Sequence, residues 1–202
     1  TAADGPYDGT RLGLAFSDSD GVALQGLDMD VDGNGSMDHL DAGATDFRAG
    51  RLSVGNAHGS ELRDLSVPVA MQFFAGPGLG FVTHTLDNCT PIASTSLSDA
   101  DTGDSLPVSD TCIVDQLGAS GGDACAAGTA GSQYRGTAQA GKYVVSLKSP
   151  GAGKTGGLRV TADAPAWAEF AWISSGNADP VGIATFGIYN RNTEVIYQRE
   201  LR

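Results

Sequence analysis

The chain of 202 residues has few basic side chains. Lys and Arg together number 12, against 24 Asp and Glu, which gives a formal net charge of -12. The only lysines are Lys142, Lys148 and Lys154, so no basic cluster is available to neutralise a row of phosphates. We therefore expect no nucleic-acid partner and no attraction to anionic membranes.

Long apolar segments and the motifs of common enzyme classes are also missing. No run of about 18 or more apolar residues occurs, so we expect no membrane-spanning helix. No signal peptide is visible at Thr1, and an exported protein would therefore be represented by its mature chain or by an excised domain. The sequence has no Gly-x-Ser-x-Gly string, no paired-carboxylate motif and no Walker loop, and we expect a protein that is not an enzyme.

Cysteine is scarce, and its spacing does not suggest a metal site. None of the three cysteines belongs to a CxxC pair and the three histidines are scattered, which argues against zinc. An oxidising compartment would allow one disulfide. Cys112 and Cys125 flank a Gly-rich stretch and form the simplest pair; Cys89 is an alternative partner for either, and three free thiols remain possible.

Glycine and aspartate, in contrast, are abundant. The chain has 29 Gly, and Asp accounts for 20 of its 24 acidic residues. Both residue types favour turns over helix interiors. Short strand-like runs separated by turns predict an all-β fold, an antiparallel β-sandwich of jelly-roll or Ig-like type. The runs cover residues 11–16, 47–54, 65–74, 79–86, 142–148, 157–161, 167–173, 182–189 and 194–199.

Details of this pattern predict local features. Gly76-Pro77-Gly78 lies between two of the runs and indicates a hairpin, whereas Pro68 predicts an edge strand or a bulge. We expect one domain over residues 1–202, with a long insertion rich in Gly, Ser and Asp at about 90–141. A short helix is expected near 111–117.

The strongest local pattern is a calcium-binding loop of EF-hand type at residues 30–41. Oxygen-bearing side chains occupy loop positions 1, 3, 5, 9 and 12, position 7 offers its carbonyl, and Gly35 at position 6 permits the sharp turn. Met37 is expected to anchor the loop in the core. No suitable helix follows, so we predict a single Ca²⁺ loop inserted between strands rather than a paired EF-hand. The expected ligands are Asp30, Asp32, Asn34, Ser36, Asp38 and Asp41.

Other acidic turns are weaker candidates for calcium. Asp28 lies just outside the loop and could serve a second ion. Asp18 and Asp20 precede a glycine, and Asp99, Asp101 and Asp104 surround another; each group has the oxygen density but not the full spacing. Ordinary Asx-turns are the alternative explanation. External millimolar calcium would fill even a weak site, which favours an extracellular protein.

Two stretches carry a family resemblance. The strings DFRAGRLSVGNAHGSELRDLSVPVAMQFFAG and GFVTHTLDNCT, together with the closing ATFGIY and IYxRE strings, resemble the C-terminal domain of MshQ-type proteins. These are exported components encoded with a type IV pilus of the mannose-sensitive haemagglutinin kind. The resemblance covers about residues 11–200. It implies a bacterial surface or pilus-associated β domain without enzymatic activity.

These observations predict two alternative functions. One is a structural subunit of a pilus or surface fibre, stabilised by Ca²⁺ and assembling with copies of itself. The other is a tip adhesin module that binds a glycan or another surface ligand, for which Trp167, Phe170 and Trp172 could form a stacking platform. Trp167 and Trp172 are an odd number of residues apart and would face opposite sides of a strand, so we expect at least one of them in the core. Both place the protein outside the cell.

Overall fold

The computed structural model describes residues 3–15, 19–21, 25–101, 104–115, 136–171 and 176–187. Two compact units divide the chain. One contains residues 51–72 and those from 83 onward, and the other contains residues 2–50 and 73–82. In the described parts the regular structure consists of strands and one 3-10 turn, η1 (Val108–Asp110). The predicted all-β fold is confirmed.

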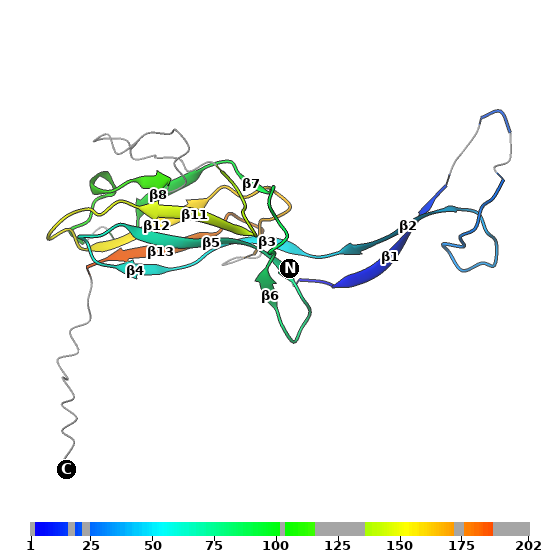
Figure 1. The fold of residues 1–202 in the computed structure, drawn as a ribbon, viewed down its shortest axis with the longest axis horizontal. Coiled ribbons are helices and arrows are strands. Elements are labelled where there is room, and N and C mark those ends of the chain that lie inside the picture. The colour runs from blue at the N-terminus through cyan, green and yellow to red at the C-terminus, as the bar shows by residue number, and fades with distance from the viewer. Residues whose placement is uncertain are drawn as a thin grey trace, which may run out of the picture. The chain divides into compact units, whose positions relative to one another are not determined.

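The larger unit is built on two main sheets (Figure 1). The first has the order β3-β5-β11-β9, with β6 also paired to β5, and the second has the order β4-β13-β12-β8. Pairing is antiparallel wherever a register is defined, except between β4 and β13. A small third sheet joins β7 (Pro91–Ile92) and β10 (Gly136–Thr137). The strands of the first sheet are β3 (Gly50–Val54), β5 (Leu65–Phe74), β6 (Phe81–Thr83), β9 (Ile113–Asp115) and β11 (Lys142–Leu147). Those of the second are β4 (Ala57–Gly59), β8 (Thr95–Asp99), β12 (Gly156–Ala162) and β13 (Val181–Phe186).

A single hydrophobic core lies between these sheets. Alternate residues of β5 point inward, beginning with Leu65 and Val67, and β12 contributes Leu158 and Val160 in the same way. Burying each Val or Leu stabilises the fold by about 1.5–3 kcal/mol relative to leaving it exposed. Because the buried faces of both sheets share one cluster, the arrangement is that of a β-sandwich.

The expectation that Pro68 marks an edge strand or a bulge is wrong. Strand β5 lies between β3 and β11, and Pro68 pairs in register with Val144. On its other side the Pro68 carbonyl accepts the N–H group of Gly55, just after β3 ends. Proline is tolerated at position 68 because β3 ends at Val54, so no further residue of β3 needs a backbone N–H group from β5 at this point.

The chain then crosses from the first sheet to the second at a tightly packed point. A Cβ at Gly182 in β13 would lie 2.4 Å from the Gly55 carbonyl oxygen, so only glycine fits. Beside this contact the Asn56 side chain accepts the N–H group of Ile183 at 2.8 Å. The glycine-rich string after β3 therefore joins the two sheets.

Part of the segment expected as an insertion at about 90–141 is instead framework. Strand β8 pairs with β12 in one sheet and β9 pairs with β11 in the other, and Leu97 and Ile113 are buried in the core. Residues 116–135 lie outside the described part. The helix expected near 111–117 is also wrong in its described portion, where β9 follows η1. The segment was predicted as an insertion because most of its residues are polar or small, and only a few of its side chains, such as Leu97 and Ile113, are apolar and buried.

Two other expected strands have different outcomes. Within the run 167–173, the described residues form a turn and a single bridge between Phe170 and Ala178 rather than a strand. Residues 188–202 lie outside the described part, so the run 194–199 stays a prediction. The hairpin around Gly76 to Gly78 is confirmed, because β6 pairs with β5 and Gly80 donates its N–H group to the Gly76 carbonyl.

The smaller unit is based on a two-stranded antiparallel ribbon, β1 (Tyr7–Leu14) and β2 (Leu40–Phe47). Its register shifts twice, between Tyr7 and Thr10 and between Leu12 and Gly13. Residues 73–82 belong to the same unit, where the rings of Phe74 and Phe81 lie 5.4 Å apart between centroids. In the described residues of both units, no helix is long and apolar enough to cross a membrane.

Candidate functional site

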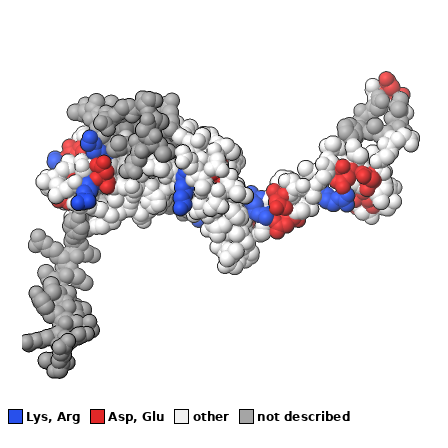
Figure 2. Space-filling view, viewed as in Figure 1, with Lys and Arg blue, Asp and Glu red and all other residues white. Residues whose placement is uncertain are grey.

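The predicted calcium loop comes after β1 along the chain and ends in the first two residues of β2, Leu40 and Asp41, and a short bridge closes it. Met29 pairs with His39, and each donates its N–H group to the carbonyl of the other at 3.0–3.1 Å. The loop is exposed along residues 31–38. Acidic side chains gather at this end of the ribbon (Figure 2). The strand pairing thus brings the two ends of the loop together without any helix.

Asp30, at loop position 1, organises the first half of the loop. Its Oδ1 atom accepts the N–H groups of Gly33 at 2.8 Å and Asn34 at 3.2 Å, and its Oδ2 atom accepts that of Gly35 at 2.8 Å. The hydrogen bond from Gly35, followed by those from the other donors, lowers the pKa of the Asp30 carboxyl. Gly33 and Gly35 both have positive φ, 73° and 89°, which favours glycine at each position.

The next two expected ligands are held against this centre. Asp32 accepts the backbone N–H of Asn34 at 3.2 Å and its side-chain amide at 2.8 Å. The Asn34 Oδ1 atom in turn accepts the N–H group of Ser36 at 2.8 Å. Three expected oxygen-bearing side chains, Asp30, Asp32 and Asn34, are therefore brought together by a network within the loop.

The last two expected ligands have other partners. The Asp38 carboxylate lies 2.5 Å from His39 Nδ1, and Asp41 forms an ion pair with Arg11 of β1. Arg11 lowers the pKa of the Asp41 carboxyl, with a further contribution from the N–H group of Gly43. Over the described residues, no three His, Cys, Asp or Glu side chains form a group that could hold a metal ion. Hydrogen bonds to Asp30 and Asp32 therefore fix the first half of the loop, whereas the acidic side chains of its second half pair with His39 and Arg11.

The weaker candidates mostly have structural partners. Asp28 accepts the N–H group of Asp41 at 2.8 Å, which ties the two ends of the loop. Asp99 accepts the N–H group of Asp101 at 3.2 Å, as in an Asx-turn. Asp20 is exposed, and Asp18 lies outside the described residues.

Asp104 connects its loop to β12. Its carboxylate accepts the N–H groups of Leu106 at 2.9 Å and Gly157 at 2.8 Å. A Cβ at Gly156 would lie within 2.5 Å of both carboxylate oxygens, so the glycine makes room for this contact. These bonds satisfy the carboxylate with backbone donors.

Met37 does not anchor the loop, and that expectation is wrong. Its side chain is 59% exposed. The apolar contact comes from Met29 and Val31 instead, which pack over Gly13 of β1, where a Cβ would lie 2.7 Å from Val31. Without a following helix or a second loop, position 8 has nothing to pack against.

The cysteines separate into different environments. Cys89 is exposed and carries a free thiol, so the alternative pairing through Cys89 is wrong, whereas Cys112 is buried. Cys125 lies outside the described residues, so the pairing of Cys112 with Cys125 stays a prediction.

Asp87 is a buried acid that no sequence pattern marks as functional, although it belongs to the GFVTHTLDNCT string. It is 5% exposed, and its Oδ1 atom accepts the N–H groups of Cys89 and Thr90, both at 3.0 Å. Burial raises the pKa of the Asp87 carboxyl, but the hydrogen bonds from Thr90 and Cys89 outweigh burial and leave that pKa below its ordinary value. Its neighbour Asn88 accepts the N–H group of Ala140 at 2.9 Å. This turn therefore fixes the approach to β11.

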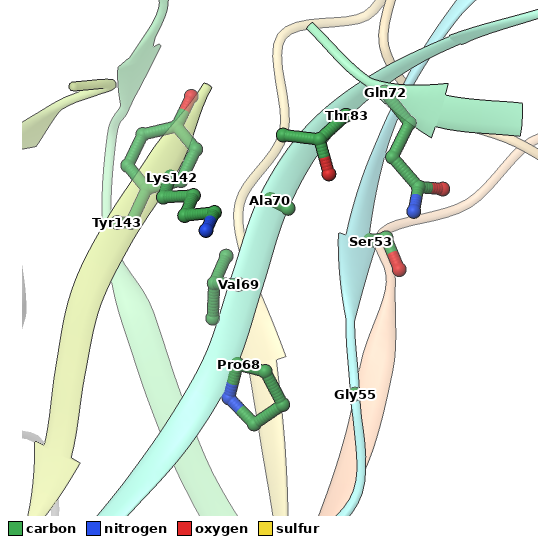
Figure 3. Close-up of a pocket in the computed structure, with 9 residues that line it drawn as sticks. All are labelled: Ser53, Gly55, Pro68, Val69, Ala70, Gln72, Thr83, Lys142 and Tyr143. Carbon is green, nitrogen blue, oxygen red and sulfur yellow. The ribbon is translucent and has the colours of Figure 1, made fainter. Parts of the chain in front are cut away.

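The larger unit also has a shallow pocket of about 350 Å³ on the β3-β5-β11 sheet (Figure 3). Small residues form much of its floor, because Pro68 and Ala70 lie along β5 and Gly55 lies beside Pro68. Ser53, Gln72, Thr83 and Lys142 supply hydroxyl, amide and ammonium groups around it. No sequence pattern pointed to this pocket, since its residues come from separate strands. The lining residues are Ser53, Gly55, Pro68, Val69, Ala70, Gln72, Thr83, Lys142 and Tyr143.

Comparison with known proteins gives one match. The family model described as DUF6701, fourth domain, matches residues 48–201. No curated protein and no solved structure is significantly similar to the chain. The matched residues begin near the end of β2 and include the sandwich.

Proposed function

The chain belongs to the DUF6701 family, and from this premise we propose that it is a non-enzymatic, extracellular structural module of a bacterial pilus or surface fibre. Ca²⁺ held by the loop at residues 30–41 stabilises it. The observation that carries this proposal is the network around Asp30, which shapes the first half of a calcium loop. The MshQ-type strings support the surface location.

The residues present fit a calcium ion once Asp38 and Asp41 leave their present partners, His39 and Arg11. Carboxylate, amide and carbonyl oxygens are the ligands that Ca²⁺ takes in loops of this spacing. Asp30, Asp32 and Asn34 already lie together, and Ser36 offers its carbonyl. Asp41 has to exchange Arg11 for the ion, which is feasible because both side chains lie at the surface, where ion pairs contribute little. The ion would then hold the two ends of the ribbon loop together.

The ribbon supports assembly with neighbouring copies. One side of β1 is covered at Gly13 by Met29 and Val31 from the loop. On the other side Leu12, Leu14 and Leu40 are 44%, 46% and 39% exposed. An isolated two-stranded ribbon is marginally stable in water, and unpaired strand edges readily accept another strand. Strand addition to this ribbon would cover the leucines and join neighbours.

A ligand-binding adhesin module is the second candidate. The pocket beside Lys142 has a volume within the range of small-ligand sites. Trp167 is 61% exposed and could stack on a sugar ring, while Trp172 lies outside the described residues. A glycan array separates this candidate, with Lys142→Ala as the pocket variant.

Negative-stain microscopy and size-exclusion chromatography, with calcium and with a chelator, test the assembly. We expect large species in calcium that dissociate in chelator. Replacing Leu12 and Leu14 together by Ser should abolish them, whereas Leu86→Ser should not, because Leu86 is 83% exposed and lies outside the ribbon. A wild-type chain that stays monomeric in both conditions would contradict the fibre and favour the adhesin module.

A further inference from the structure

Loop position 5 holds a chemically labile pair of residues. Asn34 is followed by Gly35, and this is the only Asn-Gly pair in the chain. Gly35 has no side chain to shield its nitrogen, and a Cβ built there would meet nothing within 4 Å. Both residues are exposed. No side chain at position 35 therefore shields the backbone nitrogen that follows Asn34.

We propose that Asn34 is a site of spontaneous deamidation whose rate is set by the hydrogen bond between Asp30 and Gly35. The Gly35 nitrogen loses its proton to water and attacks Cγ of Asn34, forming a new C–N bond. The bond from Cγ to Nδ2 breaks, and the side-chain nitrogen leaves as ammonia after taking a proton from water. Water then opens the cyclic imide at either carbonyl and gives aspartate or isoaspartate. Water is the only co-reactant.

The folded loop opposes each part of this reaction. The nucleophilic N–H group of Gly35 is bound to Asp30 Oδ2 at 2.8 Å, and the negative charge of that carboxylate disfavours loss of the proton. The reacting side chain is held at both ends, since Nδ2 donates to Asp32 and Oδ1 accepts from Ser36. The loop has to open before the nitrogen can reach Cγ.

The products would change the site in opposite directions. Aspartate at position 34 adds a carboxylate to the expected ligand set, which strengthens the attraction for Ca²⁺. Isoaspartate lengthens the main chain by one carbon and displaces the positions after it. This consequence rests on the proposed calcium function, whereas the deamidation itself does not.

Peptide mass spectrometry of the chain incubated in chelator tests the proposal. Asn56 and Asn88 serve as internal controls, because neither precedes a glycine. We expect conversion at Asn34 to exceed that at both controls, and Asp30→Ala to accelerate it roughly tenfold, the value of one lost hydrogen bond to a charged group. Asp32→Ala is the matched variant, which leaves the contact between Gly35 and Asp30 in place and should accelerate conversion less.

A chain unfolded in denaturant gives the rate of the fully open loop, so a variant that fails to fold is recognised by reaching that rate. Equal conversion at Asn34 and Asn56 in chelator, or equal rates for the wild type and Asp30→Ala, would overturn the proposal. Calcium at 100 times its Kd should slow the wild-type reaction about 100-fold. If calcium leaves the rate unchanged, the calcium function is contradicted while the deamidation site stands.

Discussion

The carboxylate of Asp30 accepts the backbone N–H group of Gly35 at 2.8 Å, which joins the first and sixth positions of the loop. Gly35 adopts a φ of 89° at this point, a conformation that few other residues take easily. The Asp30 side chain thus stabilises the turn at Gly35, and the turn in return places the Gly35 N–H group against Asp30. A loop shaped in advance has less conformational entropy to lose when an ion binds.

The calcium affinity should fall when the pH is lowered into the range in which Asp30 becomes protonated. Because hydrogen bonding lowers the pKa of Asp30 in the folded chain, its contribution to stability is present above the ordinary carboxyl value of 3.8 and is lost as the pH falls through the lower folded value. We expect calorimetric calcium affinity to be constant near neutral pH and to collapse below about pH 4. An affinity that stays constant from neutral pH down to about pH 3 would contradict this direction.

Removing the partner of Asp41 should strengthen calcium binding. Arg11 pairs with this carboxylate and would compete with a bound ion for it, so Arg11→Gln should free the proposed ligand at position 12. We expect a modestly lower Kd by calorimetry, and an unchanged Kd for Arg159→Gln, which alters a basic residue of β12 in the larger unit. A higher Kd for Arg11→Gln would show that Arg11 positions the loop rather than competing for it.

The buried acid Asp87 should be important for the stability of the larger unit. Asp87→Ala leaves the N–H groups of Cys89 and Thr90 without an acceptor, which costs about 1–3 kcal/mol. Urea unfolding would measure this cost. Asp163→Ala, at an exposed position, is the control and should change the unfolding free energy by less than about 0.5 kcal/mol. Equal effects of the two substitutions would contradict the role assigned to the turn.

A second stability prediction concerns Gly182, at the point where the chain crosses between the two sheets. Gly182→Ala places a Cβ 2.4 Å from the Gly55 carbonyl oxygen, and neither backbone can move easily. We expect a loss of about 1–3 kcal/mol in the free energy of unfolding. Gly176→Ala is the matched control, since a Cβ there meets nothing within 4 Å. If Gly182→Ala leaves the free energy of unfolding unchanged, Gly182 and the Gly55 carbonyl must be further apart than the structure places them.

The fold class could be predicted from the sequence because strand periodicity and turn residues are local. The strand-like run at residues 65–74, before the turn at Gly76-Pro77-Gly78, has the same bounds as β5. The central place of this strand could not be deduced, since it depends on which distant strands pair. Pro68 was misleading for that reason: a missing N–H group matters only where a neighbouring strand needs it.

The site shows the same division. The spacing predicts Asp30, Asp32 and Asn34 as calcium ligands, and local hydrogen bonds bring these three residues together. The ion pair between Asp41 and Arg11 could not be predicted, because it depends on the register of β1 against β2. The pocket beside Lys142 could not be predicted for a similar reason, since β3, β5, β6 and β11 all contribute to it.

Isothermal titration calorimetry with calcium tests the central claim most directly. The claim predicts uptake of one ion per chain, a higher melting temperature in calcium than in chelator, and loss of both effects in Asp30→Ala. The control is Asp101→Ala, which changes an acidic turn outside the loop. This variant should still take up calcium and should still melt at a higher temperature in calcium than in chelator. Absence of heat on titration, together with a melting temperature that neither calcium nor Asp30→Ala changes, would contradict it.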